Sequence, residues 1–111
     1  MKIRIKGTFV QYRLTQSEVK ALSEGQKLAE STCFGPLEGQ TFVCALEAKK
    51  GISELETSFD NHTITLYLPS EAARTWHADS RVGYERKQLV APAVELGLLV
   101  EKDFACLDDT H

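Results

Sequence analysis

Apolar and polar positions alternate most regularly over residues 55–68. In two runs, 55–59 and 64–68, every second residue is apolar or Thr, and this period of two is typical of a strand with one buried face. The sequence Asp-Asn-His at 60–62 separates the runs, and Asp and Asn favour tight turns because they tolerate positive φ. The stretch therefore predicts an antiparallel hairpin in a sheet with one packed face.

Similar but less regular patterns predict six further strands, at residues 2–6, 9–14, 27–34, 41–47, 82–90 and 96–101. Two short helices interrupt the strands. The first follows a capping box from Thr15 to Glu18, in which each side chain binds the main-chain amide of the other residue, and Gly25 ends it. Ser70 is the predicted N-cap of the second helix, and Trp76 anchors its small apolar face.

The resulting order of elements, ββαββ followed by ββαββ, indicates an internal repeat. We predict an α+β fold: an antiparallel sheet or an eight-stranded barrel from two ββαββ halves, with two short helices on one side. Residues 1–103 form a single domain, and residues 104–111 form a polar acidic tail. The predicted core consists of Ile3, Ile5, Leu22, Phe42, Leu46, Phe59, Ile64, Leu66, Trp76, Leu98 and Val100.

Positive charge is concentrated at the start of the chain. The formal net charge is −3, which argues against a nucleic-acid-binding protein, since that function needs a basic face. Residues 1–13 nevertheless contain no acid and four cations. We call Lys2, Arg4, Lys6 and Arg13 the cationic strip, and it is the candidate site for phosphate, carboxylate or an acidic partner.

Two other interpretations of the cationic strip stay open. Lysines on an edge strand protect it from aggregation, so the strip can be a solvated edge. Acids elsewhere in the chain can also neutralise it across the sheet, and the candidates are Glu54, Glu56 and Glu101.

The cysteines and the C-terminal residues predict no metal centre. Cys33, Cys44 and Cys106 are odd in number and show no C-x-x-C spacing, so we interpret them as small, buried, reduced thiols. Cys106, Asp108 and His111, together with His77, are of the types that bind zinc. Three of these four lie in a predicted tail, where such ligands are usually not held in place.

Glu54 and Glu56 are two residues apart on one predicted strand, a spacing that paired carboxylates of an acid–base site can have. The polar side of an amphipathic strand gives the same pattern, and we favour that interpretation.

The chain contains no apolar run long enough to cross a membrane, and its start lacks the apolar centre of a signal peptide. We therefore expect a cytoplasmic protein without a membrane partner.

Two ends of the chain resemble a family of short, uncharacterised bacterial proteins. The similarity lies in Lys2-Ile-Arg-Ile-Lys-Gly7, in residues 13–19 and 82–85, and in Leu99-Val-Glu-Lys-Asp-Phe-Ala-Cys-Leu107. This resemblance implies a bacterial, cytosolic, single-domain protein and no particular activity.

The two ββαββ halves also resemble, in architecture alone, the triphosphate-tunnel enzymes, which act on nucleoside triphosphates and polyphosphate with a metal. Their opening strand reads Glu-x-Glu-x-Lys, whereas this chain has Lys2-Ile-Arg-Ile-Lys6, so their acidic metal ligands are absent.

These patterns favour a non-catalytic binding or assembly module of unknown ligand, because no nucleophile–base pair or metal cluster is indicated by spacing. The alternative is a small enzyme that binds phosphate or polyphosphate with the cationic strip. The predicted partners are an anionic small molecule or an acidic protein, and a second copy of the chain. No cofactor is indicated.

Overall fold

The computed structural model describes residues 1–103. They form eight strands, two α-helices and one 3-10 turn, in the order β1 (Lys2–Ile5), β2 (Phe9–Leu14), α1 (Gln16–Ser23), β3 (Leu28–Cys33), η1 (Glu38–Gln40), β4 (Thr41–Lys49), β5 (Glu56–Asp60), β6 (Thr63–Pro69), α2 (Ser70–Trp76), β7 (Gly83–Ala91) and β8 (Val94–Lys102). The predicted hairpin over residues 55–68 is confirmed as β5 and β6, with Asn61 and His62 at positive φ in its turn. The predicted tail, residues 104–111, lies outside the described residues.

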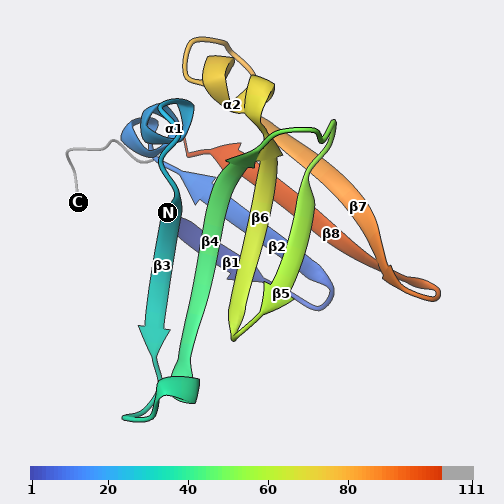
Figure 1. The fold of residues 1–111 in the computed structure, drawn as a ribbon. Coiled ribbons are helices and arrows are strands. Elements are labelled where there is room, and N and C mark those ends of the chain that lie inside the picture. Colours follow the sequence, from blue (N-terminus) through green and yellow to red (C-terminus); the bar gives the residue numbers. More distant parts are fainter. Residues whose placement is uncertain (104–111) are drawn as a thin grey trace.

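The strands form two four-stranded sheets, with the orders β1-β2-β8-β7 and β3-β4-β6-β5 (Figure 1). Each sheet contains one hairpin from each ββαββ half. The hairpins are antiparallel, but the two central pairs, β2 with β8 and β4 with β6, are parallel. The prediction of a purely antiparallel sheet is therefore wrong. Alternation specifies each hairpin because its strands are neighbours in sequence, whereas the pairing between distant hairpins depends on the crossovers through α1 and α2.

The two sheets do not close into a barrel, so that alternative is also wrong. Where β5 and β7 lie at corresponding edges of the two sheets, side chains take the place of a main-chain ladder. Arg86 Nη1 donates to the Leu55 carbonyl oxygen at 2.8 Å, and the Thr57 amide donates to Gln88 Oε1 at 3.0 Å. We call this edge, from Glu54 to Phe59 and from Tyr84 to Gln88, the seam.

The core lies between the sheets. Six of the predicted core residues are confirmed as buried: Leu22, Leu46, Leu66, Trp76, Leu98 and Val100. Ile3, Phe42 and Ile64 are partly buried and pack against this core. The core also includes Tyr12, which is fully buried and donates its hydroxyl to the Ile64 carbonyl oxygen at 3.0 Å. Burial raises the pKa of Tyr12, and the Cys44 thiol next to it raises it further.

Two residues predicted to be in the core are exposed. Ile5 is 49% exposed and Phe59 is 69% exposed. Ile5 is the last residue of β1 and Phe59 the second-last of β5, and in Figure 1 these ends of the two strands point away from α1 and α2. The alternation places both on the apolar side of their strands, but no helix covers that end of the sheets, so the pattern overestimates their burial.

Both helices lie at one end of the molecule, where they contact each other, rather than over one sheet face. The capping box of α1 is confirmed: the Glu18 amide donates to Thr15 Oγ1, and the Thr15 amide donates to the Glu18 carboxylate. Gly25 has the positive φ of 85° expected after a helix. Ser70 is not an N-cap, however. It is the first residue of α2, which continues directly from β6 and has no side-chain cap.

Replacing Thr15 with alanine is expected to lower the free energy of unfolding by about 0.5–2 kcal/mol, because the Glu18 amide loses its acceptor. Urea denaturation measures the change. Gln16→Ala is the matched control, since Gln16 is the next residue and its side chain is outside the capping box. Equal midpoints for Thr15→Ala and wild type would show that the cap contributes nothing to stability.

Candidate functional site

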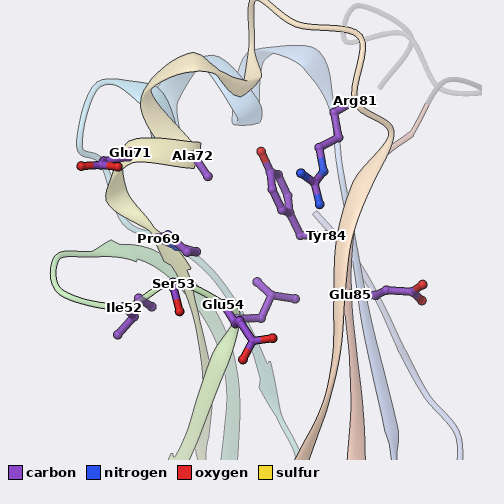
Figure 2. Close-up of a pocket in the computed structure, with 10 residues that line it drawn as sticks. Ile52, Ser53, Glu54, Pro69, Glu71, Ala72, Arg81, Tyr84 and Glu85 are labelled. Carbon is purple, nitrogen blue, oxygen red and sulfur yellow. The ribbon is translucent and has the colours of Figure 1, made fainter.

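A pocket of about 500 Å³ opens at the helix end of the seam (Figure 2). We call it the seam pocket. Three segments line it: the loop that leads into β5, the junction of β6 and α2, and the stretch from Arg81 into the start of β7. The lining residues are Ile52, Ser53, Glu54, Leu55, Pro69, Glu71, Ala72, Arg81, Tyr84 and Glu85.

The burial of Trp76 brings the third segment to the pocket. Trp76 is the last residue of α2 and is fully buried. Its indole N–H donates to the Arg81 carbonyl oxygen at 2.8 Å, and the Tyr84 ring packs edge-on against it with 5.2 Å between ring centroids. A buried Trp needs such an acceptor, because an unpaired indole N–H would be costly. The core therefore holds the main chain from Arg81 to Tyr84 at the edge of the pocket.

Arg81 and Tyr84 form one side of the seam pocket, as Figure 2 shows. The Arg81 guanidinium carbon lies 3.9 Å from the centre of the Tyr84 ring, and its Nε donates to the Gly83 carbonyl oxygen at 3.0 Å. Burial raises the pKa of Tyr84, although the Arg81 charge partly offsets the effect. Tyr84 is therefore neutral at physiological pH and presents an aromatic surface with a hydroxyl group.

Glu54 lies at the other side of the pocket, near the seam. Its carboxylate is 3.5 Å from Arg86 Nε, and 63% of its side chain is exposed. Leu55, which is 3% exposed, provides an apolar floor next to it. The lining also includes Glu71 and Glu85, but in Figure 2 their carboxylates point away from the pocket. The pocket thus combines an apolar surface with one carboxylate, that of Glu54.

Glu54 and Glu56 do not act as a pair. Glu54 contacts Arg86 in the seam, whereas Glu56 is 3.3 Å from Lys49 Nζ. The prediction that both lie on one strand is wrong, because β5 begins only at Glu56 and Glu54 belongs to the preceding loop.

Within residues 1–103, no three His, Cys, Asp or Glu side chains lie close enough together to hold a metal ion. Of the zinc-type residues, His77 borders a second pocket, and Cys106, Asp108 and His111 lie beyond residue 103.

The cationic strip lies apart from the seam pocket, on the sheet that contains β1 and β2. Lys2, Arg4 and Arg13 border a shallow depression of about 160 Å³. Lys2 Nζ lies 3.4 Å from Asp103, and Arg13 Nε lies 2.7 Å from Glu101, which also accepts a hydrogen bond from Gln11. The hydrogen bond to Glu101 raises the pKa of Arg13. Of the acids proposed to neutralise the strip, Glu101 does so, and Glu54 and Glu56 do not.

Arg4 and Lys6 differ from the other two cations of the strip. Across residues 1–103, neither has an acidic side chain within ion-pair distance. The β1–β2 register places Arg4 opposite Gln11, and Lys6 follows the end of β1.

Of the cysteines, the structure describes Cys33 and Cys44. Cys44 is buried as predicted, and burial raises the pKa of its thiol. Cys33 is exposed, so the prediction that it is buried is wrong. It is the last residue of β3, which among the described strands is paired with β4 alone.

No pattern in the sequence points to Arg81 or Tyr84 as candidate site residues. The only signal was Trp76, whose predicted anchoring role is confirmed. Periodicity does not show which residues an anchored Trp holds in place. Arg81 lies in the irregular segment after α2, and Tyr84 is the second residue of β7.

Fold and pocket together define a small α+β protein of two mixed sheets with a ligand-sized cavity at one edge. No helix among the described residues is long and apolar enough to cross a membrane. The chain belongs to a family of unknown function, DUF7009, whose family model matches residues 1–111. Comparisons with curated proteins and with solved structures gave no match. The resemblance to an uncharacterised family is thus confirmed, whereas the bacterial origin stays a prediction.

Proposed function

We propose that this protein is a non-catalytic binding module that holds a small amine in the seam pocket. The observation that carries the proposal is the Glu54 carboxylate next to an apolar floor, in a pocket of about 500 Å³, a size typical of small-molecule sites. The single arginine of the lining is already engaged by the Tyr84 ring and the Gly83 carbonyl. The Glu54 carboxylate is 63% exposed beside its partner Arg86, so an ammonium group could contact it from the pocket, and a short aliphatic chain would cover Leu55 and Ala72.

Binding is favoured over catalysis by the types of side chain in the pocket. The lining contains no His, Cys or Lys, the residues that most often act as bases or nucleophiles near neutral pH. We also keep the prediction of a cytoplasmic location, because an exposed thiol such as Cys33 stays reduced in that compartment.

A thermal-shift experiment with 1,4-diaminobutane tests the proposal. At ten times its Kd the amine should stabilise the protein by about 1.4 kcal/mol, which raises Tm by roughly 5 °C for a domain of this size. Succinate has the same number of carbon atoms but ends in carboxylates rather than amines, and it should give no shift.

Two glutamine variants locate the effect. Glu54→Gln should abolish the shift caused by the amine, because it removes the carboxylate at the pocket. Glu56→Gln is the matched control, since Glu56 is two residues away and pairs with Lys49 outside the pocket lining. Equal shifts in Glu54→Gln and wild type, or an equal response to succinate, would contradict the proposal.

A second candidate function is anion binding at the cationic strip, favoured by the lack of acidic partners for Arg4 and Lys6 within residues 1–103. Polyphosphate should bind wild type at low salt and dissociate as salt rises, since exposed charge contacts are screened. The double variant Arg4→Gln, Lys6→Gln should lose this binding. A double variant Lys27→Gln, Lys49→Gln changes the net charge equally, at lysines that pair with Glu47 and Glu56. Similar losses in both double variants would indicate nonspecific attraction.

A further inference from the structure

Strand β3 is an exposed sheet edge with little to protect it. Five of its six residues are exposed, and the sixth is half-buried. It pairs with β4 on one side only, and in Figure 1 it borders the sheet at the left. Its sequence, LAESTC, contains no Lys, Arg or Pro and a single acid, Glu30. Proteins normally protect such an edge with charges, proline or a bulge, because its free main-chain groups can pair with another strand.

The other three edges of the two sheets carry some protection. β1 has only four residues and contains Lys2 and Arg4. β5 and β7 lie along the seam, where Arg86 and Gln88 bind main-chain groups of Leu55 and Thr57. Comparable contacts are few at β3: among the described residues, its one cross-sheet ion pair joins Glu30 to the Met1 amino group.

The hydrogen bonds at the end of β3 fix the direction of its main-chain groups. The Phe34 amide donates to the Gln40 carbonyl oxygen at 2.7 Å, in the same register that pairs Cys33 with Thr41. In an antiparallel pair, every second residue points its amide and carbonyl toward the neighbouring strand. Residues 28, 30 and 32 therefore face β4. The main-chain groups of Ala29, Ser31 and Cys33 face outward, and within residues 1–103 they make no hydrogen bond.

We propose that β3 pairs antiparallel with β3 of a second copy of this chain, with Ser31 on the twofold axis. This register gives three residue pairs that exchange both main-chain hydrogen bonds: Ser31 with its equivalent, and Ala29 with Cys33 twice. A register centred on Glu30 or on Thr32 gives only two such pairs within the strand. A register centred on Glu30 would also place two carboxylates directly opposite each other, which is unfavourable.

The side chains fit the register centred on Ser31. Glu30 lies opposite Thr32 of the second copy, so no like charges meet. Phe34, which is 73% exposed and directly follows β3, comes opposite Leu28 of the second copy. The pairing thus gives an exposed aromatic side chain an apolar neighbour. The sheet β3-β4-β6-β5 of one copy would join the same sheet of the second copy. Together they would form one eight-stranded sheet across the dimer.

Sedimentation equilibrium of the full chain, at micromolar to millimolar concentration, tests the dimer. The wild-type mass should rise to twice that of one chain. Ser31→Pro should stay at the mass of one chain, because proline removes the outward amide on the twofold axis, and an edge strand tolerates proline at such a position. Ser31→Ala keeps this amide and should dimerise like wild type.

Amide hydrogen exchange in wild type gives a second measurement that needs no variant. The amides of Ala29, Ser31 and Cys33 should exchange more slowly at high protein concentration. The amides of Glu30 and Thr32 face β4 in one chain already, so their exchange should change less. A wild-type mass of one chain at all concentrations, or a Ser31→Pro variant that still dimerises, would overturn the proposal. If Ser31→Pro does not fold, concentration-independent exchange at the three outward amides of wild type would overturn it.

Discussion

Replacing Trp76 with alanine is expected to lower the free energy of unfolding by about 3–5 kcal/mol, the usual cost of truncating a buried aromatic residue. Trp76 is fully buried, and its ring contacts Tyr84 edge-on. The truncation leaves a cavity and also removes the donor to the Arg81 carbonyl. Since a domain of this kind is stable by only about 5–15 kcal/mol, the variant should be close to unfolding. Denaturant titration followed by circular dichroism measures the change.

Trp76→Phe separates the two contributions at this position. Phenylalanine fills much of the space but lacks the N–H, so the Arg81 carbonyl loses its partner at a cost of about 1–3 kcal/mol. The phenylalanine variant should therefore lie between wild type and Trp76→Ala. A loss below about 1 kcal/mol for Trp76→Ala would contradict the structure, because this position would then not be a packed one.

Replacing Leu66 with alanine is expected to destabilise the protein by about 2–5 kcal/mol. Leu66 is fully buried in the middle of β6, between β4 and β5 and paired with Leu46 and Thr57. Strand β6 is paired on both sides, so the cavity cannot close by a small shift. Unfolding in urea gives the free-energy difference.

Phe59→Ala is the matched control for Leu66→Ala. Phe59 lies on the adjacent strand β5 and continues the same alternation, yet it is 69% exposed. Its truncation should change stability by less than about 0.5 kcal/mol, as is usual for surface positions. If the two variants lost equal stability, the open end of the sheets would have to be packed in solution. The pair of variants therefore measures where the core ends.

The seam explains how the pocket and the fold are connected. In a closed barrel, the main chains of β5 and β7 would pair, and no side chain would be needed between them. Here Arg86 and Gln88 bridge the gap. The seam pocket opens at the end of the seam that is nearest to α2. Binding at the seam pocket and pairing at β3 use different sheet edges, so the two proposals can fail independently.

The sequence by itself determined the local elements. Alternation specified the β5–β6 hairpin, and the spacing of Thr15 and Glu18 specified the start of α1, because both depend on residues only a few positions apart. The order ββαββ-ββαββ follows from the same local signals. The family of unknown function was likewise indicated by short stretches of sequence.

Only the tertiary structure decided which hairpins pair, whether the sheets close and which side chains meet. Glu54 and Arg86 are far apart in sequence, and so are Arg13 and Glu101. The exposure of Phe59 depends on where the helices lie, which its own strand cannot reveal. The seam pocket arises because burial of Trp76 holds Arg81 and Tyr84 opposite the loop before β5. Such long-range contacts depend on the packing of the whole chain, and a local pattern of apolar and polar residues contains no information about them.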